Sequence, residues 1–136
     1  MVTARDIRTG DALPAFTRVA YQRALDDFPF LADSSHKDDY AQSKGYKAAL
    51  LSGYILCGYL SRYFVDFFGP DWLTTGEIDL AFVRAVHQRE QITIRATVTN
   101  RIEEKDGARL TIDFSIEKAD GVQAVVGKAS GLVKTA

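Results

Sequence analysis

The most constraining feature of the sequence is one long apolar segment that is followed only by strand-like segments. Bulky apolar side chains recur at spacings of three and four residues over 52–68, which predicts one long helix. Ser52 and Gly53 suit its start, and Gly69-Pro70 suits a sharp end. Bulky residues occur on most sides of this helix, so we expect it to be largely enclosed. The apolar positions are Ile55, Leu56, Tyr59, Leu60, Tyr63, Phe64 and Phe67.

Strand-like segments lie on both sides of this helix. They are rich in β-branched and aromatic residues and partly alternate between apolar and polar positions. Asp106-Gly107 and Asp120-Gly121 separate the last of them, and Asp-Gly favours tight hairpin turns. The order predicts an α+β fold in which an antiparallel sheet packs on one long helix. The predicted strands are 16–21, 76–86, 91–99, 110–117 and 122–133.

The segment between the first strand and the long helix is predicted to be mixed. A short helix is expected over 22–30, interrupted at Pro29, and a polar loop over 31–37. Ser35 can cap a second short helix that runs to about Gln42, because its hydroxyl can accept a hydrogen bond from a free N–H of the first turn. Gly45 then allows a turn.

Composition limits the class of protein. The 136 residues are 46% hydrophobic and 26% charged, which excludes a disordered chain and suits one domain over 1–136 with its own core. The 17 basic and 18 acidic residues give a net charge of −1. Because no basic excess is present, we expect neither nucleic acid nor an anionic membrane as a partner.

Cysteine and histidine are scarce. The single Cys57 excludes an intrachain disulfide, and the two histidines leave little for a metal site, so we expect no metal and no cofactor. The first residues show no apolar secretory segment. The most apolar stretch, 50–68, contains Arg62 and Asp66, which indicates a buried helix rather than a membrane span. We therefore expect a cytoplasmic protein.

Several short motifs follow one another in a recognisable order. They are His36-Lys37-Asp38-Asp39-Tyr40-Ala41, Gly45-Tyr46 and Ala49-Leu50-Leu51-Ser52-Gly53, with Gly10-Asp11-Ala12-Leu13-Pro14 before them and Phe82-x-x-Ala85-Val86 after them. In this order and spacing the chain resembles the MaoC-like acyl dehydratases and (R)-specific enoyl-CoA hydratases. The resemblance covers nearly the whole chain. It implies the hotdog fold, in which a curled antiparallel sheet wraps around one long central helix.

The resemblance also implies a reaction and a set of site residues. Hydration of a 2-enoyl thioester needs a base for the attacking water, an acid for C2, and donors for the negative charge on the thioester oxygen. Asp33 and His36 are the candidate acid–base pair. Free N–H groups at the start of the long helix, above all that of Gly53, are candidate oxyanion donors, and Ser52 is a candidate substrate contact.

The chain departs from the family where the catalytic carboxylate belongs. The family carries an aspartate five residues before the histidine, and that position is Leu31 here. Asp33 stands where the family has asparagine, and Ser34 replaces proline. Either the loop is two residues shorter and Asp33 supplies the carboxylate, or the catalytic aspartate is missing.

Each of these residues also has a structural interpretation. Asp33 and His36 could belong to a solvated loop that caps the next helix. Ser52 could act only as an N-cap, and Gly53 could serve only packing. His87 lies between two predicted strands beside polar residues, so we expect it in an exposed turn.

An acyl thioester of coenzyme A or of an acyl carrier protein is the substrate that the resemblance implies. No phosphate-binding glycine-rich loop is visible, so scattered basic groups would hold a nucleotide; Arg84, Arg95 and Lys128 are candidates. A single hotdog unit leaves one sheet edge open and its helix partly uncovered. We therefore expect a homodimer, with a heterodimer as the alternative.

Two other functions remain open. A hotdog thioesterase commonly places an acid on or just before the long helix, but no acid occurs from Leu50 to Val65. A non-catalytic binding module, or a subunit that completes an active heterodimer, would explain the displaced aspartate.

Overall fold

The computed structural model describes residues 6–21, 38–45 and 50–134. The helix expected over 22–30 and the loop expected over 31–37 lie outside these ranges. The element order confirms the predicted α+β plan. It runs β1 (Phe16–Val19), α1 (Asp38–Ser43), α2 (Gly53–Phe68), α3 (Trp72–Thr75), β2 (Glu77–Phe82), β3 (Gln91–Glu104), β4 (Gly107–Lys118) and β5 (Gln123–Lys134).

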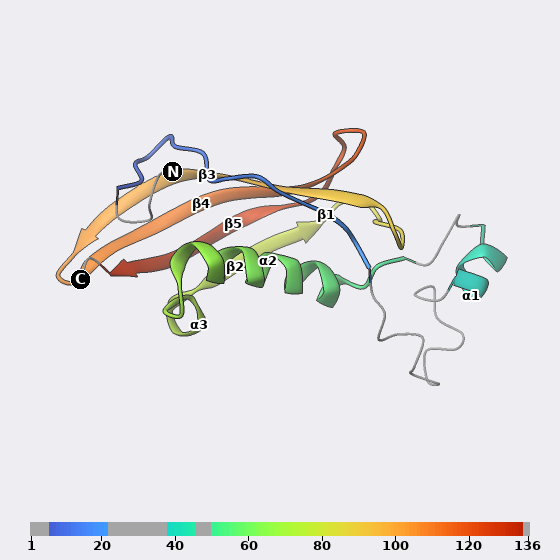
Figure 1. Ribbon diagram of the computed structural model, residues 1–136, viewed down its shortest axis with the longest axis horizontal. Coiled ribbons are helices and arrows are strands. Elements are labelled where there is room, and N and C mark those ends of the chain that lie inside the picture. The colour runs from blue at the N-terminus through green and yellow to red at the C-terminus, as the bar shows by residue number, and fades with distance from the viewer. Residues whose placement is uncertain (1–5, 22–37, 46–49, 135–136) are drawn as a thin grey trace.

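The strands form one five-stranded antiparallel sheet in the order β1-β3-β4-β5-β2. Consecutive hairpins join β3 to β4 and β4 to β5, as the two Asp-Gly turns predict. β2, the strand that follows the helices, pairs with β5 and forms the edge of the sheet opposite β1. Figure 1 shows the sheet curving over α2, which runs along one of its faces.

α2 begins and ends where the sequence predicts. The Ser52 hydroxyl accepts a hydrogen bond from the Ile55 N–H, and Gly69 ends the helix with a φ of 82°. Such a positive φ favours glycine, because a Cβ would clash with the backbone. No helix within the described ranges is long and apolar enough to cross a membrane.

One face of α2 makes the core, contrary to the expectation of an enclosed helix. Leu60 and Phe64 are fully buried, whereas Tyr54 is 90% exposed and Arg62 pairs with Asp66 in solvent. The Phe64 ring meets Phe114 of β4 edge-on at 5.6 Å between centroids. The aromatic residues of this helix therefore divide between core and surface. The buried positions of α2 are Leu56, Leu60, Tyr63, Phe64 and Phe68.

A glycine in β5 lets the helical layer approach the sheet closely. A Cβ on Gly131 would lie 3.0 Å from the Phe68 ring and 3.1 Å from the Trp72 indole. The Phe68 and Trp72 rings stack at 5.2 Å. Both aromatic side chains thus pack against bare backbone, which keeps this end of α2 close to the sheet.

The strands differ from the predicted ranges at their ends. β2 stops at Phe82 instead of continuing to Val86, because the N–H groups of Val83 and Arg84 both donate to the Ala124 carbonyl and the chain then leaves the sheet. β3 continues to Glu104, and α3 was not predicted. These ends depend on partners that are distant in sequence, so local patterns do not show them.

Tyr63 anchors the N-terminal segment to α2. Its hydroxyl donates a 2.8 Å hydrogen bond to the Pro14 carbonyl, and burial raises its pKa to about 12. Burial therefore favours the neutral phenol in the folded state. The stability that depends on this neutral phenol is fully present below pH 10, the pKa of an ordinary tyrosine, and is lost as the pH rises towards 12.

Replacing Tyr63 with phenylalanine is expected to lower the free energy of unfolding at pH 7 by about 1–2 kcal/mol, because the Pro14 carbonyl loses its donor. Urea unfolding at pH 7 measures the loss of the hydrogen bond, and its comparison with unfolding at pH 11 measures the pH dependence of the phenol. The variant should also lose less stability than the wild type between these pH values. An equal alkaline loss in both proteins would contradict the role of this phenol.

Candidate functional site

The start of α2 presents backbone donors beside a cavity. Ser52 caps the helix: its carbonyl accepts from the N–H groups of Ile55 and Leu56, and its hydroxyl accepts from Ile55 at 3.4 Å. Within the described ranges, the N–H groups of Gly53 and Tyr54 have no acceptor. The geometry confirms Ser52 as an N-cap and leaves the first N–H groups of the helix available to a ligand.

The segment after β2 fixes this helix start in place. Leu50 and His87 form an isolated antiparallel bridge, and the Leu51 N–H donates to the Val86 carbonyl at 2.8 Å. Leu51 and Val86 are both buried. The first turn of α2 therefore lies beside the end of the edge strand β2, although about thirty residues separate them in sequence.

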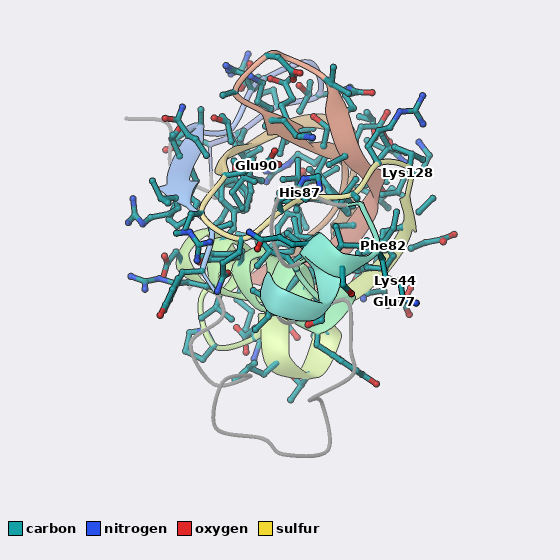
Figure 2. All side chains as sticks on the ribbon, turned by 90° about the vertical axis from the view of Figure 1, so that its right-hand side faces the viewer. Lys44, Glu77, Phe82, His87, Glu90 and Lys128 are labelled. Atoms are coloured by element: carbon teal, nitrogen blue, oxygen red, sulfur yellow. The ribbon has the colours of Figure 1, made fainter. Side chains whose placement is uncertain are left out.

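A cavity of about 390 Å³ lies between these two segments. Its walls are mostly apolar, and Arg84 is the one charged residue among those that line it. The Phe82 ring lies directly against Gly53, since a Cβ there would be 2.8 Å from the ring. Figure 2 faces this end of the molecule and labels Phe82. The lining residues are Leu51, Gly53, Leu56, Phe82, Val83, Arg84, Ala85 and Val86.

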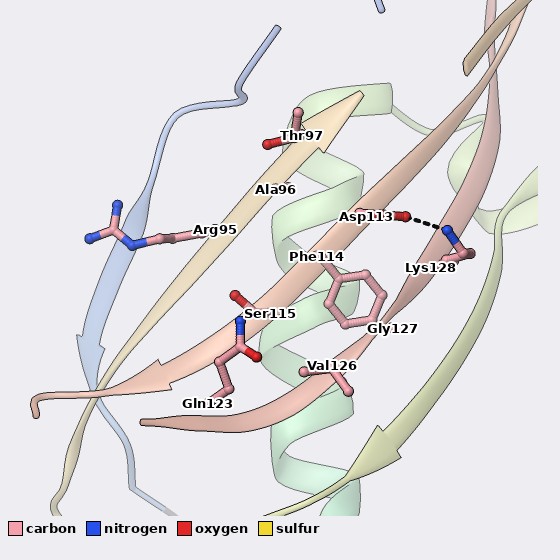
Figure 3. A pocket seen from close by; sticks show the side chains of 10 residues that line it. All are labelled: Arg95, Ala96, Thr97, Asp113, Phe114, Ser115, Gln123, Val126, Gly127 and Lys128. Atoms are coloured by element: carbon pink, nitrogen blue, oxygen red, sulfur yellow. Dashed lines mark hydrogen bonds and ion pairs between the residues drawn. The ribbon is translucent and has the colours of Figure 1, made fainter. Parts of the chain in front are cut away.

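The other two candidate cations lie on the opposite face of the sheet. Arg95 and Lys128 line a separate groove of about 430 Å³ on β3, β4 and β5. Figure 3 looks at this groove with α2 behind the sheet. Lys128 pairs with Asp113 at 2.7 Å, and Arg95 pairs with Glu117 at 2.9 Å. Of the three predicted cations, only Arg84 shares a cavity with Gly53.

His87 is not in an exposed turn, so that expectation was wrong. Its side chain is only 15% exposed, and its Nδ1 lies 3.4 Å from a carboxylate oxygen of Glu90. Lys118 of β4 approaches the same carboxylate at 3.4 Å. Figure 2 shows His87 and Glu90 at the end of the molecule where α2 begins. Local sequence patterns did not predict the burial of His87. The residues that surround it include Leu50, its bridge partner, and Lys118, which pairs with Glu90, and both are distant from His87 in sequence.

The predicted acid–base pair does not fall within the residues that the structure describes. Asp33, His36 and Leu31 lie outside the described residues. Their convergence on Gly53, and the choice between a shortened loop and a missing aspartate, therefore stay predictions. The described part of the site consists of the donors, the apolar walls and the Arg84 cation.

Comparison with solved structures identifies the fold. A MaoC-like dehydratase from Rhodospirillum rubrum aligns with a TM-score of 0.74 and 15% identity, over 98% of this chain and 97% of that chain. The (R)-hydratase from A. caviae involved in PHA biosynthesis aligns with a TM-score of 0.72 and 17% identity, over 95% and 98%. The chain has the hotdog fold of the MaoC-like dehydratases.

A third hotdog structure comes from an assembly of two proteins. A chain of the ChsH1–ChsH2 complex from Mycobacterium tuberculosis aligns with a TM-score of 0.72 and 19% identity, over 93% of this chain and 98% of that chain. No protein-family model and no curated protein sequence matches this chain. The hotdog fold predicted from the motifs is thus confirmed. Sequence identities below 20% support the fold and do not by themselves assign an activity.

Proposed function

We propose that the chain catalyses the hydration of a 2-enoyl thioester or the reverse dehydration of a 3-hydroxyacyl thioester. The observation that carries the proposal is the cavity at the start of α2, where the Gly53 N–H has no acceptor in the described residues and the walls are mostly apolar. The fold, shared with hydratases and dehydratases over nearly the whole chain, supports the same class of reaction.

Each part of the proposed site has one chemical task. The Gly53 N–H donates to the thioester oxygen as negative charge develops on it, and the helix dipole adds to this stabilisation. Asp33 and His36 serve as the acid–base pair: one group takes a proton from water as the oxygen attacks C3, and a proton is delivered to C2. The absence of a side chain on Gly53 makes room for the Phe82 ring, which forms the apolar wall beside this donor.

The carrier portion of the proposed substrate is anionic, and Arg84 is the cation that we propose to bind it. No carboxylate pairs with the Arg84 guanidinium within the described ranges, and this guanidinium donates a 2.6 Å hydrogen bond to the Val83 carbonyl. A guanidinium binds phosphate oxygens well. Coenzyme A and the phosphopantetheine arm of a carrier protein both bring such a phosphate.

The proposed activity is tested by following the loss of the conjugated enoyl-thioester absorbance with crotonyl-CoA and with a longer 2-enoyl-CoA. Turnover by the purified protein would support the proposal. Absence of turnover with both substrates would favour the non-catalytic alternative. That alternative has its own support in Leu31, which stands at the position of the family's aspartate.

A thioesterase is less well supported. None of the residues that line the cavity at the start of α2 is acidic. The acid on α2, Asp66, lies near its other end, and its carboxylate is 3.8 Å from the Arg62 guanidinium in solvent. A water-activating carboxylate is therefore missing from the described part of the site.

We expect the protein, as one domain over 1–136, to form a homodimer through the open edge of β2. This strand pairs only with β5 among the described strands, and the exposed side chain of Val83 stands just beyond its end. An uncovered strand edge presents unpaired backbone groups and favours pairing with another sheet. Light scattering at micromolar concentration measures the mass. A monomeric mass would contradict the expectation, and stable copurification with a second hotdog chain would favour a heterodimer.

A further inference from the structure

Phe82 combines an exposed side chain with a very close backbone contact. As the last residue of the edge strand β2, it is 52% exposed. Its ring nevertheless lies so close to the first residue of α2 that a Cβ on Gly53 would be 2.8 Å from Cζ and 3.1 Å from Cε2. The exposed ring therefore leans against the backbone that carries the proposed oxyanion donor.

Among the apolar side chains that line the cavity, Phe82 is also one that can be shortened with little effect on the core. Leu51, Leu56 and Val86 line the same cavity but are buried in the core. Core side chains are held by close packing, and they cannot move without opening voids. Phe82 is half exposed, so shortening its side chain opens no void in the core.

We infer that Phe82 is a specificity-determining residue: its ring limits how long an apolar acyl chain can lie beside the first turn of α2. The inference rests on the proposed function, because it takes the thioester to be held at Gly53. An acyl chain attached to that thioester would begin next to the ring. Each additional methylene that gains an apolar wall improves binding by roughly fourfold, so a residue that blocks the chain strongly affects selection by length.

The test measures equilibrium binding of butyryl-CoA and octanoyl-CoA by calorimetry. Both ligands are saturated, so they cannot be hydrated and the readout needs no turnover. The proteins are the wild type, Phe82→Ala and Phe82→Leu. The control is Leu73→Ala, which also shortens an exposed apolar side chain but lies on α3. Phe82→Ala is expected to raise the ratio of octanoyl to butyryl affinity at least about tenfold, Phe82→Leu to raise it less, and Leu73→Ala to leave it unchanged.

Other outcomes would overturn the inference in distinguishable ways. If the wild type binds both ligands and the ratio is unchanged or lower in Phe82→Ala, the ring does not limit chain length. If Phe82→Ala alone becomes monomeric in light scattering, the ring is a contact between subunits instead. If the wild type binds neither ligand, the proposed function fails and the inference fails with it. Phe82→Leu keeps an apolar side chain and provides the measurement if the alanine variant does not fold.

Discussion

Replacing His36 or Asp33 with alanine is expected to lower the turnover of crotonyl-CoA by about two to four orders of magnitude. Loss of a positioned acid or base typically has this effect, because the proton transfers to C2 and from water then lose their partner in the transition state. The measurement is kcat/KM for each variant, and the ratio to the wild type converts directly into a difference in barrier height.

Asp33→Asn is the sharper variant, since it keeps the size of the side chain and removes only the charge. Its matched control is Asp39→Asn, which neutralises another aspartate of the same stretch and leaves Asp33 and His36 unchanged. Strong loss in Asp33→Asn alone would support the shortened loop. Full activity in Asp33→Asn would exclude Asp33 as the base and return attention to the position of Leu31.

The second large effect is expected on stability. Phe64→Ala should lower the free energy of unfolding by about 3–5 kcal/mol, because it removes a fully buried ring and leaves a cavity. The Phe64 ring projects from α2 towards α3 and β4. Its centroid is 4.8 Å from the ring centroid of Trp72 and 5.6 Å from that of Phe114. A domain of this size has a total stability of roughly 5–15 kcal/mol, so a large share would be lost.

Urea unfolding followed by circular dichroism measures this loss. Phe64→Leu should cost less than alanine, since it refills part of the space. Leu73→Ala is the control, because that side chain is 76% exposed and its loss should change stability by no more than about 0.5 kcal/mol. A cost below about 1 kcal/mol for Phe64→Ala would show that the core does not depend on this ring.

Local sequence patterns were sufficient for the long helix and for the hairpins that follow it. The spacing of apolar residues over 52–68 predicted α2, and Ser52 and Gly69 predicted its ends. Two Asp-Gly turns predicted the hairpins that connect β3, β4 and β5. These features depend on residues within a few positions of one another, and backbone preferences at that range are strong enough to be read directly.

The sequence was less informative about what surrounds each element. Bulky residues on several sides of α2 predicted an enclosed helix, yet Tyr54 is exposed. His87 was expected in an exposed turn, yet it packs beside Glu90, whose carboxylate also pairs with Lys118. Burial depends on which distant segments arrive at a residue, and no periodicity within one element contains that information.

By itself, the sequence predicted the long helix with its caps, the hairpin strands after it and, through a set of short motifs, the hotdog fold. The same motifs named the candidate residues Asp33, His36, Ser52 and Gly53. Only the tertiary structure decided that Phe82 lies against Gly53 and that Arg84 lines the same cavity, whereas Arg95 and Lys128 lie on the other face of the sheet. The physical reason is that caps and turns are set by neighbouring residues, whereas a cavity forms where segments far apart in the chain meet, and their meeting is fixed by packing across the whole core.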